Sequence, residues 1–249
     1  MKTSKLFQSI EKKIPPNIAL NEDKIGFFGS KSILEENIEK VLVLMDYLPL
    51  KNLEELKKQK ILNYNDFDLM VLHHPPPDNI KLEYPVYIIH SNWDIVPGGA
   101  CDALADTLNI TTSGVLDHAT GLGRLGNLNN GPVYLEEFMD LVQKKLDLDY
   151  LRVVNDENTL INDIALVSGF GLNPYFINLS YGKGVDLYLS GDLTHPGAIL
   201  AKNLGIKLID ATHHATEIPG LYRLGEVISD SGVEVQIFDS DLPWNTHSR

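Results

Sequence analysis

Short apolar runs that end in histidine and carboxylate residues constrain the fold of this chain more than any other feature. A run of four to six apolar, β-branched or aromatic residues is typical of a buried strand. In open parallel sheets, ligands bind beyond the carboxyl ends of the strands. Imidazole and carboxylate groups gathered there predict a metal site, and the lack of cysteine ligands suits zinc, iron or manganese. The runs are residues 67–72 before His73 and His74, residues 86–89 before His90, residues 185–189 before Asp192 and His195, and residues 205–209 before Asp210, His213, His214 and Glu217.

The order of the predicted elements indicates an α/β protein. Residues 41–45 read as a buried strand, residues 50–60 carry leucines at helical spacing, and residues 67–72 form the next strand. This strand–helix–strand order is typical of a parallel sheet. The Gly- and Asn-rich residues 121–131 are the predicted internal boundary. We also expect a helix before Pro15, a helix over residues 132–146, and strands over residues 150–154, 164–167 and 233–238.

Composition argues against several classes of function. The 249 residues include 21 basic and 34 acidic ones, and the formal charge of −13 argues against nucleic acid as an obvious partner, although it does not exclude a local basic surface. Cys101 is the single cysteine, which excludes an intramolecular disulfide framework and favours an inert core thiol over a reactive one. No run approaches the roughly 18 to 20 apolar residues that span a bilayer, and no secretory signal is visible. We therefore expect a soluble, cytoplasmic protein without a membrane partner.

The histidines after the first two runs each have a structural alternative. His73 and His74 precede three prolines that hold the backbone extended, where adjacent side chains point in opposite directions. The pair can therefore serve two metals instead of chelating one, or it can be two surface histidines in a proline-rich loop. His90 is either a ligand or a hydrogen-bonded structural histidine. Asp94 is either a ligand or the cap of a helix that begins near Gly98.

The segment from His213 to Glu217 is a stronger pattern. A histidine and a glutamate four residues apart on a helical turn lie on one face and can reach one ion. Alternatively, Thr216 caps the helix and places Glu217 in its first turn, and both interpretations can hold at once.

Two further motifs carry weaker signals. Asp192 and His195 follow a strand, but Asp192 or Thr194 can also cap a helix that begins near Pro196. Residues 121–126 contain three glycines but lack the Gly-Lys-Ser/Thr of a P-loop, so a glycine-rich turn with one arginine is favoured.

Together these motifs resemble the GTP cyclohydrolase 1 type 2 homologue family, also described as NGG-one-interacting-factor-three-like. The resemblance covers most of the chain, and the order of its motifs makes it specific. The matching segments are His73-His74-Pro75, His90-x-Asn92-x-Asp94, Gly121-x-Gly123-Arg124-x-Gly126, Ser190-Gly191-Asp192 and Asp210-x-x-His213-x-x-Thr216-Glu217.

The resemblance implies two similar α/β lobes with mixed sheets and a dinuclear metal site at the carboxyl ends of strands. The expected lobes are residues 1–120 with 205–249, which carry the metal ligands, and an inserted lobe of residues 121–204. The resemblance also implies a ring-shaped homohexamer, a trimer of dimers. The implied ligands of two divalent ions are His73, His74, Asp94, His213 and Glu217, with His90 and His195 as the groups beside them.

This chain departs from the family pattern in two places. The family's early Trp-Asp-Asn-x-Gly-Leu appears as Glu22-Asp23-Lys24-Ile25-Gly26-Phe27, which puts in doubt the substrate contact made there. His214 stands where the family has an aromatic residue, which leaves open that His214 adds to the metal shell.

Three functions fit these residues, and a metal-dependent hydrolase of a nucleotide-type substrate ranks first. Two ions can activate a water and polarise a substrate, while Asp94 and Glu217 hold or bridge the ions and His90 or His195 carries protons. The second function is a ring that binds single- or double-stranded DNA non-specifically through lysines such as Lys51. For those lysines a solvated surface helix is the stronger interpretation, because glutamates share their segment. The third function is metal storage or delivery.

Overall fold

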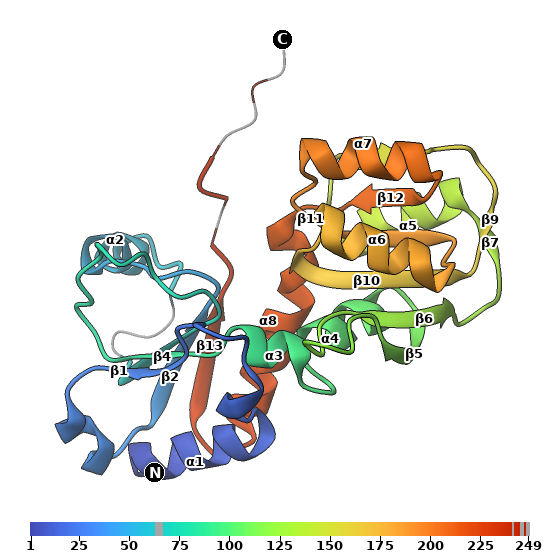
Figure 1. Cartoon of the computed structure of the whole chain (residues 1–249). Helices are drawn as coiled ribbons and strands as arrows, with labels where there is room; N and C mark the ends of the chain where they lie inside the picture. Colours follow the sequence, from blue (N-terminus) through green and yellow to red (C-terminus); the bar gives the residue numbers. More distant parts are fainter. Residues whose placement is uncertain (63–66, 241, 245–246, 248–249) are drawn as a thin grey trace. The chain divides into compact units, whose positions relative to one another are not determined.

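The chain forms two compact units (Figure 1). The computed structural model describes residues 1–62, 67–240, 242–244 and 247. Unit 1 comprises Met1–Val96 and Leu221–Arg249, and unit 2 comprises Pro97–Gly220. In chain order, unit 2 is therefore inserted into unit 1.

Unit 1 is built on a mixed sheet with the strand order β1-β4-β3-β2-β13 among the described residues. Strands β4, β3, β2 and β13 run parallel, and β1 pairs antiparallel with β4 at the edge. The inner strands are buried on both faces, which explains why they read as continuous apolar runs. The strands are β1 (Gly26–Phe28), β2 (Lys40–Leu44), β3 (Leu69–Leu72), β4 (Val86–Ile88) and β13 (Glu234–Phe238).

Helices cover both faces of this sheet. Leu53 of α2 packs in one cluster with Val86 and Ile88 of β4. Tyr87 points to the opposite face, because side chains alternate along a strand, and its ring centroid lies 4.4 Å from that of Phe7 in α1. The helices of unit 1 are α1 (Thr3–Lys13), η1 (Pro16–Ile18), η2 (Lys31–Glu35), α2 (Leu50–Lys58), α3 (Ser91–Ile95) and the end of α8 (His213–Ser229).

Unit 2 contains a second mixed sheet, with the described strands in the order β5-β6-β10-β11-β12-β8. Strands β10, β11 and β12 run parallel, whereas β5, β6 and β8 pair antiparallel with their neighbours. Strands β7 and β9 form a separate pair. The strands are β5 (Ile110–Val115), β6 (Arg124–Leu128), β7 (Val133–Tyr134), β8 (Arg152–Val154), β9 (Leu160–Ile161), β10 (Asp163–Phe170), β11 (Leu187–Gly191) and β12 (Lys207–Asp210).

The sheet of unit 2 lies between two pairs of helices. Ile164 and Leu166 of β10 join a cluster with α4 and α5, while Ala165 and Val167 join a cluster with α6 and α7. Figure 1 shows α6 and α7 side by side. The helices are α4 (Ala100–Thr107), α5 (Leu135–Leu146), α6 (Pro174–Lys183), α7 (His195–Leu204) and the start of α8 (His213–Ser229). Cys101 of α4 is fully buried, as expected of a core thiol.

The division between the units differs from the one expected at residues 120/121 and 204/205. Residues 121–131 lie within unit 2, because β5 and β6 pair antiparallel and join the sequence on both sides of Gly121 into one sheet. Strand β12 also belongs to this sheet, so His213 belongs to unit 2 and His73 to unit 1. None of the helices among the described residues combines the length and apolar character needed to cross a membrane.

Candidate metal centre

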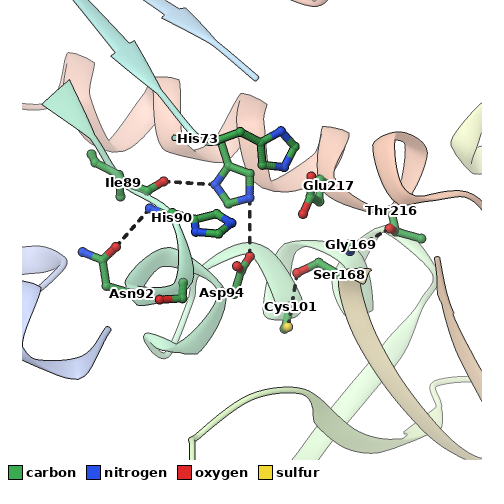
Figure 2. Close-up of polar contacts among 12 residues, drawn as sticks. His73, Ile89, His90, Asn92, Asp94, Cys101, Ser168, Gly169, Thr216 and Glu217 are labelled. Carbon is green, nitrogen blue, oxygen red and sulfur yellow. Dashed lines mark hydrogen bonds and ion pairs between the residues drawn. The ribbon is translucent and has the colours of Figure 1, made fainter. Parts of the chain in front are cut away.

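His73 and His74 follow β3 at its carboxyl end in unit 1. The side chain of His73 is buried, and its Nδ1 lies 3.0 Å from the carbonyl oxygen of Ile89 (Figure 2). Its Nε2 is directed at Asp94, with 3.8 Å between Nε2 and Oδ1. The Nδ1 of His74 lies 3.0 Å from Oδ1 of Asp46, which follows β2.

The expectation that His73 and His74 point in opposite directions is wrong. Their ring centroids lie 4.9 Å apart, with 43° between the ring planes. Strand β3 ends at Leu72 and the chain bends at both histidines, so the alternation of side chains along a strand no longer applies. Both rings can therefore contribute to one cluster of ligands.

His90 follows β4, and Asp23 holds its ring. Nδ1 of His90 lies 2.8 Å from Oδ1 of Asp23, and Ser91 donates to the other carboxylate oxygen from its backbone N–H, at 3.1 Å, and from its hydroxyl. Burial alone would raise the pKa of Asp23, but the bonds from His90 and Ser91 outweigh it and lower the pKa to about 2. Asp23 is therefore a carboxylate at neutral pH.

Asp94 lies in the short helix α3, not at the start of the next helix. Its side chain is largely buried and faces His73. Helix α4 begins at Ala100, and its preceding Gly98 donates to Asp102. The capping alternative for Asp94 is therefore wrong.

In unit 2, His213 is held between two carboxylates. Its Nδ1 lies 2.6 Å from Oδ2 of Asp192, at the end of β11, and its Nε2 lies 3.2 Å from Oε1 of Glu217. Glu217 is buried, and it shares a face of α8 with His213 as the four-residue spacing predicted. Thr212 accepts from the backbone N–H of Ala215, so it, and not Thr216, caps the first turn.

The end of β10 shapes the space around this pair. Gly169 has a φ of +71°, and a Cβ built there would collide with Oε1 of Glu217 and lie 3.2 Å from Nε2 of His213. The backbone N–H of Gly169 donates to Oγ1 of Thr216 at 2.9 Å, which ties the strand end to α8 within unit 2 (Figure 2). Glycine is therefore required at this position by both backbone conformation and space.

Other residues singled out by the sequence differ in where the structure places them. Thr194 caps α7 by accepting from Gly197, whereas Asp192 binds His213. His195 is exposed at the start of α7, and the groups of ligand atoms found among the described residues do not include it. His214, on the first turn of α8, is partly buried and is likewise outside these groups.

The glycine-rich segment 121–126 is also structural. Arg124 is buried and forms a bidentate ion pair with Asp102, with Nε–Oδ1 and Nη2–Oδ2 distances of 3.0 and 2.8 Å. A Cβ at Gly126 would lie 2.5 Å from the carbonyl oxygen of Thr111 on the paired strand β5. Only residues 121–123 agree with the favoured interpretation as a turn, because Arg124 and Gly126 lie in strand β6.

A shared pattern links the histidines at the strand ends: Nδ1 faces an oxygen that cannot donate a proton. The carbonyl of Ile89 and the carboxylates of Asp46, Asp23 and Asp192 can only accept, so each Nδ1 carries the hydrogen. In a neutral imidazole the lone pair then lies on Nε2, the arrangement of histidines that bind metal ions. Imidazole and carboxylate donors without thiolates fit zinc, iron or manganese.

Asp23 and Asp46 were not among the predicted site residues. Asp46 follows β2 by two residues, so the strand-end rule that selected His73 also applies to it. Asp23 lies 67 residues before His90 in an irregular segment, and its only signal was its place in the early motif that departs from the family pattern.

Comparisons with known proteins show what this chain resembles. The family model described as Duf34/NIF3 (NGG1p interacting factor 3) matches residues 78–243. A protein of Methanothermobacter thermautotrophicus named GTP cyclohydrolase 1 type 2 homolog is 42% identical, with 97% of this chain and 94% of that relative covered. A protein of the same name from Methanocaldococcus jannaschii is 32% identical over 97% of this chain and 100% of its own. The solved structure of reduced HcgD from Methanocaldococcus jannaschii has a TM-score of 0.79 at 31% identity and covers 97% of this chain and 98% of its own.

Proposed function

Because this chain belongs to the Duf34/NIF3 (NGG1p interacting factor 3) family, we propose that it holds two divalent metal ions and hydrolyses a nucleotide-type substrate. The proposed ligands are His73, His74 and Asp94 of unit 1 and His213 and Glu217 of unit 2. The observation that supports them best is the orientation of the imidazoles. An acceptor oxygen binds Nδ1 of each ligand histidine and leaves the lone pair of the neutral ring on Nε2.

The surroundings of these residues fit metal ions better than a purely structural role. Buried carboxylates are costly unless they are paired or bind a cation, and both Asp94 and Glu217 are largely buried beside a histidine. Gly169 leaves space in front of the pair formed by His213 and Glu217 that a side chain would fill. Each unit therefore carries donors that suit a metal ion.

Bound divalent ions would supply Lewis acidity and lower the pKa of a water from about 16 toward 7. The residues of this chain supply the rest of the chemistry. Asp94 and Glu217 bring negative charge to balance the cations, and Asp46 and Asp192 fix the rings of His74 and His213.

A proton carrier must reach the reacting group. Of the two predicted carriers, His90 adjoins His73 and His74, whereas His195 is exposed on α7, where its role stays a prediction. The nucleotide class is supported by the relatives named GTP cyclohydrolase 1 type 2 homolog.

Turnover of GTP by the full chain tests this proposal. The metal-free protein, loaded with Zn²⁺, Mn²⁺ or Fe²⁺ in turn, is incubated with GTP, and products are separated by chromatography. We expect hydrolysis only with metal, and a loss of at least about 100-fold on Asp94→Ala, because electrostatic stabilisation is commonly worth that much. His118→Gln, a change of an exposed histidine in unit 2, is the control and should keep full activity.

Other results would contradict the hydrolase. Equal turnover by metal-free protein or by Asp94→Ala would show that the chemistry does not depend on these residues. Retention of two ions without turnover of GTP or other nucleotides would favour metal storage or delivery instead.

We also propose a ring-shaped homohexamer, a trimer of dimers, supported by the family resemblance. Light scattering should give a mass about six times that of the 27.8 kDa chain. A mass near that of one chain would contradict the proposal, and a stable dimer would support the repeating unit but not the ring.

A further inference from the structure

We propose that the exposed ring of Phe170 is the surface on which the base of a bound nucleotide stacks, within unit 2 and beside His213. This inference rests on the proposed nucleotide substrate and deepens it, because it names the residue that holds the base. It concerns an uncharged aromatic side chain, and it stands on the contacts of the strand end that carries this ring.

The first observation is the place of Phe170 in the sheet of unit 2. Phe170 is the last residue of β10, whose six preceding residues are buried, and its own side chain is 52% exposed. Strands β10, β11 and β12 run parallel, so Phe170 lies at the edge of the sheet where ligands bind in open α/β folds. Single exposed apolar residues are common on protein surfaces, so the neighbours of Phe170 decide what its exposure means.

The second observation is the closeness of Phe170 to His213. Gly169 precedes Phe170, and a Cβ built on Gly169 would lie 3.2 Å from Nε2 of His213. Consecutive Cα atoms are about 3.8 Å apart, so the backbone of Phe170 lies one residue beyond this point. The register partner of Phe170 on β11 is Gly191, where a Cβ would lie 2.5 Å from the backbone nitrogen of His213. A ligand that contacts His213 can therefore also reach the ring of Phe170.

The third observation is that the backbone on both sides of Phe170 is held in place. The carbonyl of Gly169 accepts from the hydroxyl of Ser190 at 3.1 Å, and the carbonyl of Gly171 accepts from the hydroxyl of Tyr188 at 2.8 Å. Both donor residues are fully buried. A ring carried on a fixed backbone loses less conformational entropy when a ligand binds than a ring on a mobile loop.

The fourth observation is that the nearest neighbours of Phe170 have no side chains with which to cover its ring. Gly169 and Gly171 flank it along the chain, and Gly191 is its register partner. An uncovered aromatic ring attracts another flat π-system by stacking, and every nucleobase has such a face. Because stacking does not read the edge of the base, Phe170 adds affinity for purine nucleotides in general and not for guanine alone.

Calorimetric titration of the full chain tests this inference. The Zn²⁺-loaded protein is titrated with the analogue of GTP in which an imido group joins the β- and γ-phosphates, and separately with inorganic triphosphate, which has no base. We expect Phe170→Ala to raise Kd for the GTP analogue by about 5- to 150-fold, the range for the loss of one base–aromatic stack. Kd for inorganic triphosphate should not change, and the matching ATP analogue should lose as much affinity as the GTP analogue.

Two other replacements of Phe170 separate stacking from apolar bulk. Phe170→Leu keeps an apolar side chain without a π face and should lose nearly as much affinity as Phe170→Ala. Phe170→Trp should keep the affinity, and the GTP analogue, but not inorganic triphosphate, should quench the fluorescence of the added indole.

Tyr181→Ala is the matched control. The ring of Tyr181 is 51% exposed, much like that of Phe170, but it lies in the last turn of α6, shortly before β11 begins. It is therefore near the opposite edge of the sheet, and its removal should leave every Kd unchanged.

The inference is overturned if Phe170→Ala leaves Kd for the GTP analogue unchanged, if it raises Kd for inorganic triphosphate equally, or if Phe170→Leu binds like the unaltered protein. An unchanged Kd together with a changed mass in light scattering would show instead that a second copy of the chain covers the ring. If Phe170→Ala lost its folded-state circular dichroism, Phe170→Trp would decide, since an indole that the GTP analogue does not quench contradicts stacking.

Failure of this inference can be told apart from failure of the proposed function. Nucleotide binding that does not depend on Phe170 would overturn the stacking surface and leave the substrate class standing. Binding that depends on Phe170 without turnover would support the stacking surface and contradict the hydrolase. An unaltered protein that binds neither nucleotide analogue would contradict both.

Discussion

The two units hold their histidines in different ways. In unit 1 the acceptors behind His73, His74 and His90 come from three segments that lie 16, 28 and 67 residues away along the chain. In unit 2, His213 meets Glu217 four residues on along the same helix, and Asp192 lies 21 residues away at the end of the neighbouring strand. Unit 1 therefore depends on tertiary structure to orient its ligands, and unit 2 depends mainly on one helical turn.

The backbone around the ligands differs as well. In unit 2, left-handed residues surround His213, with φ of +58° at Asp192, +63° at Thr212 and +71° at Gly169. In unit 1, Glu22, which precedes Asp23, has a φ of +67°. Such conformations cost of order 1–3 kcal/mol each for residues other than glycine and persist only where their surroundings hold them. Three left-handed residues therefore adjoin the helical turn of His213 in unit 2, whereas one, Glu22, adjoins the long-range hydrogen bonds of unit 1.

Gly169→Ala should have the largest effect on metal binding and stability in unit 2. The new Cβ would collide with Glu217, and the positive φ alone should cost about 1 kcal/mol or more. We expect loss of the metal bound through His213 and Glu217 and a fall in the free energy of unfolding measured with urea.

Gly184→Ala is the matched control for Gly169→Ala. Gly184 has the same φ of +71°, but a Cβ there would meet nothing within 4 Å. It should therefore show the backbone cost alone and keep its metal. If Gly169→Ala also kept full metal content, the space in front of Glu217 would not be needed for binding.

Glu217→Ala should lower the metal content next most strongly. The change removes a buried carboxylate beside Nε2 of His213 and leaves the ligands of unit 1 intact. Metal analysis of the purified variant should find one ion per chain where the unaltered protein holds two. A variant that still held two metal ions per chain would contradict the proposed set of ligands.

Asp46→Asn and Asp192→Asn should sharpen the comparison between the units. Each removes the charge that orients a ligand histidine, and such changes commonly weaken metal binding by about 10- to 100-fold. The side chain of Asp46 is 59% exposed and that of Asp192 is 48% exposed. Because a hydrogen bond to a charge weakens as it becomes more exposed, isothermal titration with Zn²⁺ should show the larger loss for Asp192→Asn. The reverse order would mean that exposure does not set the strength of these two contacts.

In unit 2, acid should produce the smallest effect of these changes, and it acts there through Asp117. Burial would raise the pKa of this group, but hydrogen bonds from Thr120, Ala119 and Tyr175 lower it below 3.8. A pKa that is lower in the folded state gives stability that is present above 3.8 and lost as the pH falls through the folded-state value. Asp117→Asn should therefore flatten the decline of the free energy of unfolding below pH 3.8, and Asp156→Asn, an exposed control, should not.

The sequence predicted those features that local patterns encode. The apolar runs before His73, His90 and His213 became β3, β4 and β12 because strands buried on both faces need continuous apolar residues. The pairing of His213 with Glu217 followed from helical spacing. The resemblance to the Duf34/NIF3 family is confirmed by the comparisons.

Features that depend on distant pairing could not be predicted in the same way. Strands β5 and β6 carry polar residues and glycines, so only their pairing identifies them, and β6 lies in the stretch that was taken for a boundary. Asp23 gains its role from a contact across 67 residues. The bend that brings His73 and His74 together depends on where β3 ends, and sequence patterns locate element ends poorly.

Anomalous scattering from crystals grown without added metal tests the central claim most directly. The account predicts two ions bound through Nε2 of His73, His74 and His213, at the roughly 2.0–2.1 Å typical of zinc–imidazole bonds, with Nδ1 of each ring still on its acceptor oxygen. Ions bound through Nδ1, or no ion beside these histidines even after soaking in Zn²⁺, would contradict it.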